Sequence, residues 1–149
     1  MSPRFANKSL VAALALTLVA TAVSAGDATD AADARRLEAA RAHAGDSVET
    51  VRFLRPINGY EVLGQHSVLV WQTNTKAWLV DVRESAACRA SALDNSVAVG
   101  IETAVDTLNT RNGYVTGRDS LRCKITQIRE VDVPAMRVAE RSAAAAPKA

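Results

Sequence analysis

Between Val48 and Val133, apolar residues recur with the period of two that is typical of β-strands. The plainest examples are two β-rich runs, Ser67–Gln72 and Lys76–Val82, separated by a short polar segment. Two such runs joined by a tight turn predict an antiparallel hairpin. This hairpin constrains the fold to one that is built around an antiparallel sheet.

Alternation places the side chains of the hairpin on two faces. One face of the second strand carries Trp78, Val80 and Val82, and the other carries Leu79, Asp81 and Arg83. A four-residue loop that includes Lys76 would set Trp71 opposite Trp78, and such an aromatic pair adds about 0.2–1 kcal/mol. The two indoles could instead form a platform on which a ligand stacks. With few aromatic residues in the chain, packing in the core is the preferred interpretation.

Shorter runs extend the strand pattern on both sides of the hairpin. The predicted strands are Val51–Arg55, Tyr60–Gly64, Tyr114–Thr116 and Leu121–Thr126. Asn58–Gly59 and Asn112–Gly113 are tight-turn signals. In the last strand Ile128 breaks the parity of Cys123 and Ile125, which predicts either a β-bulge or the end of the strand.

The segment 97–108 fits two kinds of structure. Val97, Val99 and Ile101 alternate as in a strand, whereas Val97, Ile101, Val105 and Leu108 recur at helical spacing. Both alternatives stay open from the sequence alone.

These patterns predict one mainly β domain over residues 47–134, closed by Pro134. About five to seven short antiparallel strands suit a small barrel or a compact sandwich with an N-terminal helical lead-in. The lead-in, residues 26–46, is rich in Ala, with Leu37 as its only large apolar residue before Gly45. It is therefore expected to be weakly helical and mobile. Residues 135–149 form an Ala/Pro/Lys tail that is expected to be disordered.

The first 25 residues have the features of a signal peptide. Arg4 and Lys8 precede an apolar stretch from Leu10 to Val23, and small residues lead to a cleavage site after Ala25. The stretch is too short for a membrane span, which needs about 20 residues. Cleavage would leave 124 of the 149 residues, a periplasmic or secreted chain. No cysteine follows at a lipid-attachment position, so neither a lipid anchor nor a membrane span is expected.

Removal of this segment changes the charge balance. The full chain has 18 basic and 16 acidic residues, and loss of Arg4 and Lys8 leaves 16 of each. A neutral mature chain argues against binding to nucleic acid or to an anionic membrane through net charge. The expected state is a monomer.

The two cysteines, Cys88 and Cys123, lie in the mature chain. In an oxidising compartment one disulfide between them is the simplest expectation. Closing a loop over their separation of 35 residues stabilises a domain by about 4 kcal/mol in the chain-entropy model. Two buried thiols or a redox-active pair are the alternatives. Neither cysteine has histidine or cysteine neighbours at metal-ligand spacing, and no cofactor is expected.

A spaced pattern of residues links this chain to a known family. The pattern comprises Leu63–Gly64, Ser67–Trp71, Trp78–Val82, Cys88 with Leu93, Gly117–Asp119, Cys123–Ile125 and Ile128. It resembles a family of short exported proteins, many of them lipoproteins, from xanthomonad-type proteobacteria, a domain of unknown function. The resemblance covers about Val51 to Val133 and implies an address in the cell envelope and a disulfide, but no activity.

Two groups of residues are candidates for a site. Arg118, Arg122 and Lys124 could hold an anionic group, although Gly117–Ser120 also fits a structural turn and these cations could instead pair with acids such as Asp81 or Glu130. His66, with Ser67, Ser120 or Asp81, could form a hydrolytic site. His43, the other histidine, is expected to be solvated.

The preferred function is binding rather than catalysis. The chain is interpreted as a disulfide-stapled β module of the periplasm that binds a protein or a cell-envelope component. The alternative is a small-ligand carrier or a hydrolase with a loop site around His66 and Arg118. A flat apolar patch or an open sheet edge would favour the first, and a concave pocket with titratable groups the second.

Overall fold

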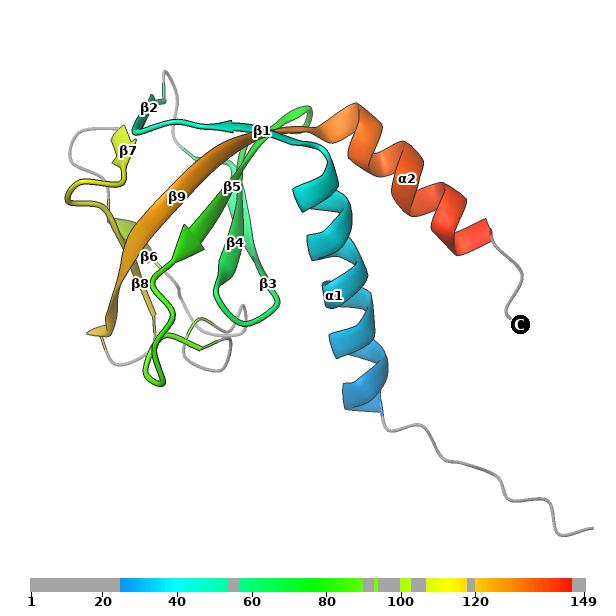
Figure 1. Cartoon of the computed structure of the whole chain (residues 1–149), viewed down its shortest axis with the longest axis horizontal. Coiled ribbons are helices and arrows are strands. Elements are labelled where there is room, and N and C mark those ends of the chain that lie inside the picture. The colour runs from blue at the N-terminus through cyan, green and yellow to red at the C-terminus, as the bar shows by residue number, and fades with distance from the viewer. Residues whose placement is uncertain are drawn as a thin grey trace, which may run out of the picture.

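The computed structural model describes residues 25–53, 57–89, 93, 100–102, 107–117 and 120–145 (Figure 1). In chain order the elements are α1 Ala25–Ala42, β1 Ala44–Ser47, β2 Thr50–Arg52, β3 Gly59–Leu63, β4 Ser67–Thr73, β5 Lys76–Val82, β6 Gly100–Glu102, β7 Thr107–Asn109, β8 Tyr114–Thr116, β9 Arg122–Asp132 and α2 Val133–Ala145. The protein is mainly β with one helix at each end, which confirms the predicted fold class.

The strands form two antiparallel sheets. The larger runs in the order β3-β4-β5-β9-β8-β6, with β1 paired to β9, and the smaller is the pair β2-β7. The long strand β9 joins the parts of the larger sheet, because it pairs with β8 at its start and with β5 and β1 further on (Figure 1). Within the described residues the sheet is not closed into a barrel. Of the two predicted forms, the compact sandwich is the one that fits.

Both faces of the β4-β5 hairpin are buried. Val68, Val70, Trp78, Val80 and Val82 face one core, which also includes β2 and β7 residues. The opposite face carries Leu69 and Leu79 into a second core beneath the helices. This double burial explains why β4 reads as a continuous apolar run rather than a clean alternation.

The two tryptophans do not form the predicted cross-strand pair. Trp78 lies opposite Val70, and Trp71 lies opposite Ala77, because the register shifts between Trp71 and the turn. They therefore project to different faces: Trp78 is buried in the core shared with β2 and β7, and Trp71 is half-buried on the helix side. The prediction of an aromatic pair is wrong, whereas core packing holds for Trp78.

A bulge in β9 accounts for the parity break at Ile128. Asp81 pairs with Gln127, but the next residue, Val82, pairs with Ile125. Thr126 is the extra residue, so Ile125 and Ile128 enter the same core. The bulge was one of the two predicted alternatives, and the strand continues beyond it to Asp132.

Helix α1 is packed against the sheet rather than mobile. Ala40 is fully buried, and Leu37 packs against the second core. Gly64 has φ +61° and lies under Leu37, so the turn after β3 leaves room for that side chain. The expectation of a loose lead-in is wrong because Ala residues allow the helix to approach the sheet closely enough for a single Leu to be enclosed.

The predicted disordered tail, residues 135–149, is also wrong over residues 135–145, which belong to α2. The carboxylate of Asp132 accepts a hydrogen bond from the Ala135 backbone N–H at 3.0 Å, which caps the helix. Pro134 lies in the first turn, where its missing N–H costs nothing. Met136 is fully buried against the second core, so Pro134 begins an element rather than ending the domain.

The segment 97–108 is strand at its described positions. Residues 100–102 form β6 against β8, and residues 107–109 form β7 against β2. Residues 94–99 and 103–106 lie outside the described part of the chain. The helical alternative does not apply to the two stretches that are described.

The two Asn–Gly pairs behave differently. Asn112 lies in the predicted turn, and its backbone N–H donates to the Asn109 side chain at 2.8 Å. The Asn58 N–H instead donates to the Trp71 carbonyl at 2.8 Å, so Gly59 continues the sheet as the first residue of β3. A Cβ on Gly113 would collide with the backbone carbonyl of Asn109, whereas one on Gly59 would meet nothing within 4 Å.

This contrast predicts opposite results for two matched substitutions. Gly113→Ala is expected to lower the free energy of unfolding by about 2 kcal/mol, because backbone must move to admit the methyl group. Gly59→Ala should change it by less than about 0.5 kcal/mol, toward greater stability. Urea unfolding of both variants checks this, and equal losses would contradict the described geometry.

Candidate functional site

A cavity lies where the last turns of α1 meet the turn after β3, the end of β5 and the bulge of β9. Its volume is about 670 Å³. It is lined by Leu37, Arg41, Gln65, His66, Ser67, Asp81, Val82, Arg83, Glu84, Thr126 and Gln127. Most of these side chains are polar or charged, so the cavity suits a hydrated or charged group rather than an apolar one.

A buried carboxylate forms the floor of the cavity. The Ser67 hydroxyl donates to Asp81 Oδ1 at 2.6 Å, and Arg129 Nη2 donates to Asp81 Oδ2 at 2.8 Å. The side chains of Asp81 and Arg129 are only 18% and 19% exposed, and Ser67 is 1% exposed. Each carboxylate oxygen therefore has a partner of its own, which offsets the cost of burying the charge.

Strand register explains how these three residues meet. Ser67 and Asp81 are directly opposite each other in the β4-β5 pairing, so their side chains share a face. Asp81 pairs with Gln127 on β9, and Arg129 is two residues further along the same face. The arrangement places a complementary charge beside Asp81 from the neighbouring strand.

Arg41 enters the cavity from α1 and makes only long contacts there. Its Nη2 lies 3.3 Å from the Ser67 hydroxyl oxygen and 3.9 Å from Asp81 Oδ1. The side chain is 53% exposed. Because Arg129 already neutralises Asp81, the positive charge of Arg41 is only weakly compensated within the cavity.

His66 lines the cavity but does not form the predicted hydrolytic arrangement. Its Nε2 is buried and has no hydrogen-bond partner among the described residues, while its carbonyl accepts from the Val82 N–H at 2.9 Å. The Ser67 proton is directed to Asp81 rather than to the imidazole. Ser120, the other candidate nucleophile, is exposed with φ 59° and is not among the residues lining the cavity.

One family model is matched by this sequence. The model described as "Family of unknown function (DUF6491)" matches residues 6–147. The chain belongs to this family. The resemblance to a domain of unknown function is thereby confirmed at the level of the family. No curated protein and no solved structure matches the DUF6491 chain.

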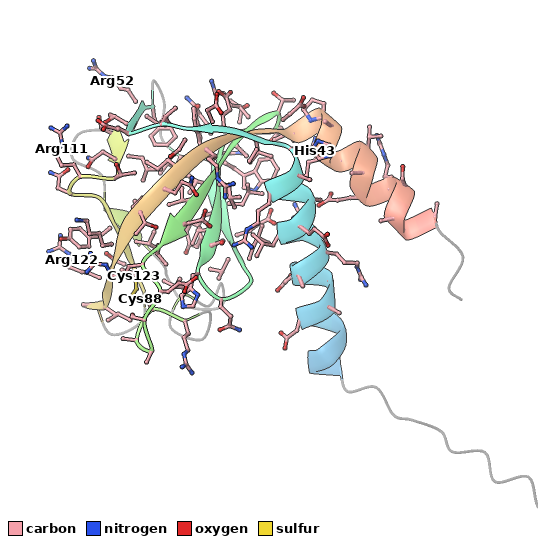
Figure 2. The ribbon with its side chains drawn as sticks, viewed as in Figure 1. His43, Arg52, Cys88, Arg111, Arg122 and Cys123 are labelled. Atoms are coloured by element: carbon pink, nitrogen blue, oxygen red, sulfur yellow. A yellow bond between two sulfur atoms is a disulfide. The ribbon has the colours of Figure 1, made fainter. Side chains whose placement is uncertain are left out.

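The anion-binding group predicted in this DUF6491 protein, Arg118 with Arg122 and Lys124, stays a prediction, because the described residues include only its last two members. Arg118 and Asp119 lie outside the described part of the chain. Arg122 is exposed on the side of the molecule away from the helices, 4.5 Å over the Tyr114 ring (Figure 2). Strand alternation places Lys124 on the same face two residues on.

The acids proposed as partners for these cations are engaged elsewhere. Asp81 pairs with Arg129, and Glu130 lies 3.2 Å from Lys76. That part of the prediction is wrong because the bulge in β9 and the β5-β9 register bring other basic residues beside both acids.

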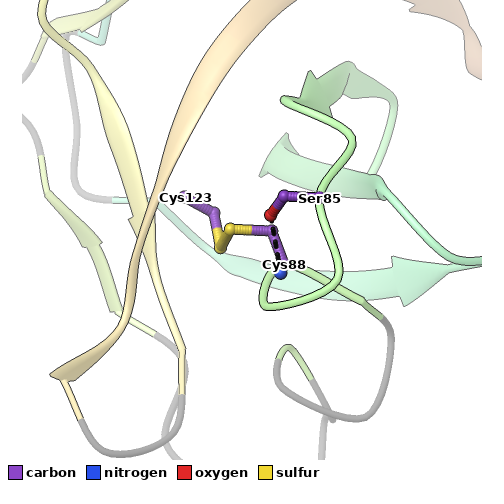
Figure 3. Close-up of a disulfide and its surroundings, with 3 residues drawn as sticks. All are labelled: Ser85, Cys88 and Cys123. Atoms are coloured by element: carbon purple, nitrogen blue, oxygen red, sulfur yellow. Dashed lines mark hydrogen bonds between the residues drawn. A yellow bond between two sulfur atoms is a disulfide. The ribbon is translucent and has the colours of Figure 1, made fainter.

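The two cysteines are joined in a disulfide between Cys88 and Cys123, with a Cα–Cα distance of 5.7 Å (Figure 3). Both are buried, and the Cys88 N–H donates to the Ser85 hydroxyl at 3.1 Å. The bond ties the segment after β5 to the start of β9. It confirms the pairing predicted from the cysteine count, and its burial identifies it as a structural bond rather than a redox-active one.

The described residues contain no group of three or more His, Cys, Asp or Glu residues placed to hold a metal ion. His43 directly follows α1 (Figure 2). It is not among the residues that line the cavity. None of the described helices is both long and apolar enough to cross a bilayer.

Sequence reasoning missed Arg41, which lines the cavity, and Arg129, which pairs with Asp81 on the cavity floor. Arg41 belongs to a segment interpreted as mobile, and Arg129 lies beyond the parity break in β9. A usable signal was Asp81 itself, an acid within the apolar run of a buried strand, which requires a cationic partner. Only the strand register identifies that partner as Arg129.

Proposed function

We propose that this protein is an exported, disulfide-stapled β module that binds a small ligand or a small polar group of a cell-envelope component, because a concave pocket with titratable groups favours the small-ligand alternative. The observation that carries the proposal is the polar cavity beneath α1. Both carboxylate oxygens of Asp81 there accept hydrogen bonds, whereas Arg41 makes only a long contact to Asp81. A concave site with a few convergent polar groups is the usual form of a ligand site. The ligand is accordingly a small molecule or a small group of a larger envelope component.

The exposed surface supports a polar ligand over a flat apolar contact. Among the described residues, the large apolar side chains that are exposed are Val48 and Val138, at 36% and 54%. Val48 follows β1 and Val138 lies in α2, and neither packs against one of the two cores. Docking of a protein through a broad apolar face is therefore the less favoured mode.

The chemistry of Ser67 supports binding over hydrolysis. A nucleophilic serine must be reachable and must give its proton to a base. Ser67 is 1% exposed, and its hydroxyl is used to stabilise the Asp81 carboxylate. The same interaction makes Ser67 a structural support of the cavity floor.

Export and a periplasmic or secreted location are part of the proposal. They are supported by the apolar segment Leu10–Val23, by the small residues before Ala25 and by the buried disulfide. The resemblance to exported proteins of xanthomonad-type proteobacteria supports the same address. We propose that the mature chain works as a monomer without a lipid anchor.

Native mass spectrometry of the protein released from the periplasm tests the proposal. We expect a chain lacking residues 1–25, lighter by two hydrogens than its reduced form, and carrying a small molecule. Gln65→Trp, at an exposed position in the cavity lining, should obstruct part of the cavity and release that molecule. Thr50→Trp, on an exposed part of β2 away from the cavity, is the matched control and should retain it.

Two outcomes would contradict the proposal. A molecule that survives Gln65→Trp but is lost from Thr50→Trp binds elsewhere on the protein. A full-length chain confined to the cytoplasm would overturn the exported location, since processing at Ala25 requires transport.

A further inference from the structure

We propose that the cavity recognises an oxyanion, a carboxylate or a phosphate, through Arg41 with His66 as a second contact. This inference rests on the proposed function and names the chemical class of ligand for that same cavity. The class of ligand follows from which charges and hydrogen-bond donors of the cavity already have partners within the protein.

The carboxylate of Asp81 leaves no strong acceptor for a cationic ligand. One oxygen accepts from Ser67 at 2.6 Å, and the other accepts from Arg129 at 2.8 Å. Arg129 is as deeply buried as Asp81, so the two form an internal pair rather than an open charge. A ligand entering the cavity therefore meets the Asp81 group as a neutralised unit.

Arg41 retains most of its hydrogen-bonding capacity. A guanidinium carries five N–H donors in a rigid fork, which matches two oxygens of a carboxylate or phosphate. Only one of its nitrogens, Nη2, makes contacts in the cavity, and these are 3.3 Å to Ser67 and 3.9 Å to Asp81. Because the side chain is 53% exposed, an incoming oxyanion can pair with it without first breaking a strong contact.

The local charge also favours an anion. The charged residues that line the cavity are Arg41, Arg83, Asp81 and Glu84, and Arg129 stands behind Asp81. Three positive and two negative side chains leave an excess of one positive charge. Glu84 and Arg83 are both exposed, so solvent screens their influence more than that of the buried pair.

His66 lines the cavity and supplies a second polar group there. Its Nε2 is buried, and no hydrogen-bond partner for it is found among the described residues. A buried polar atom without a partner costs free energy, which a ligand can recover by bonding to it once the imidazole turns toward the cavity. The tautomer with the proton on Nε2 would then donate to an oxyanion.

Nuclear magnetic resonance titration with sodium acetate and, separately, inorganic phosphate tests the inference. The chain has two histidines, so the His66 imidazole signals can be assigned against His43. We expect saturating shifts of the His66 and Arg41 side-chain signals in the wild-type protein. Arg41→Gln should weaken binding by about tenfold or more, because a charge-assisted fork is lost.

Two further variants separate the effect of the bidentate guanidinium geometry on affinity from the effect of the positive charge. Arg41→Lys keeps the charge but loses the fork, and should bind with intermediate affinity. Arg35→Gln removes the same charge from an exposed position of α1 and should bind like the wild type. The probe that binds more tightly identifies the class of oxyanion. Unchanged amide shifts outside the cavity establish that each variant is folded.

Equal affinity of wild type and Arg41→Gln for both probes would overturn the inference. The mass-spectrometric result then decides whether the proposed function falls with it. If Arg41→Gln still retains a small molecule that Gln65→Trp releases, the cavity binds a ligand that is not an oxyanion. If no variant and no wild-type sample retains one, the proposed binding function fails as well.

Discussion

Replacing Cys88 and Cys123 together with alanine is expected to lower the free energy of unfolding by about 4 kcal/mol. The bond closes a loop between residues 35 apart in sequence, and removing it restores the corresponding entropy to the unfolded chain. Domains of this size have a total stability of about 5–15 kcal/mol, so the loss is a large share. Urea unfolding of the oxidised protein and the double variant measures it.

The reduced wild-type protein provides the control for this effect. Reduction removes the bond while leaving the sulfur atoms in place, so its stability should fall close to that of the double variant. The segment between β5 and Cys88 should gain mobility first, because the bond is its covalent tie to β9. Stability within about 1 kcal/mol of the oxidised protein in both cases would contradict the structural role.

Asp81→Asn is expected to lower the free energy of unfolding by about 3 kcal/mol. The substitution keeps the shape of the side chain but leaves the Arg129 guanidinium buried without its counter-charge. Arg129→Met should lower the free energy of unfolding by a similar amount, since it leaves the Asp81 carboxylate without its counter-charge. The double variant should lose clearly less than the sum, and a double-mutant cycle measures this coupling.

The Lys76–Glu130 pair is the matched comparison. It joins the same two strands, β5 and β9, at 3.2 Å, but its side chains are 44% and 52% exposed. Glu130→Gln should therefore change the stability by less than about 0.5 kcal/mol. A larger loss of stability for Glu130→Gln than for Asp81→Asn would show that burial does not determine how much these ion pairs contribute to stability.

The central hairpin could be predicted from the sequence because its apolar period is local information. Ser67–Gln72 and Lys76–Val82 are short β-rich runs beside a tight turn; β5 has the predicted bounds, and β4 extends one residue beyond them. The parity break at Ile128 was also readable, although it allowed either a bulge or the end of the strand.

Long-range register could not be predicted in the same way. The offset between Trp71 and Trp78 depends on an irregularity at the turn, and a shift of one residue changes the cross-strand partner. The pairing of β2 with β7 joins segments that are far apart in the chain. No local pattern identifies such a partner.

The helices show where propensity alone misleads. An Ala-rich segment with one Leu is marginal in isolation, yet α1 is held by Leu37 and Ala40 against the sheet. Arg36 adds an ion pair to Glu61 of β3 at 2.9 Å. In α2, Met136 packs into the same core that Leu37 contacts from α1. Because these are tertiary contacts, the sequence alone did not predict that α1 forms one wall of the cavity.

The position of the bound component on the protein tests the central proposal most directly. We would titrate isotopically labelled protein with the small-molecule fraction of its own cell envelope and map the backbone amide shifts. The proposal predicts shifts concentrated at Arg41, Gln65, His66, Ser67 and Val82 around the cavity. Shifts confined to other surfaces, such as β2, β7 and β8, with the cavity residues unmoved, would contradict it.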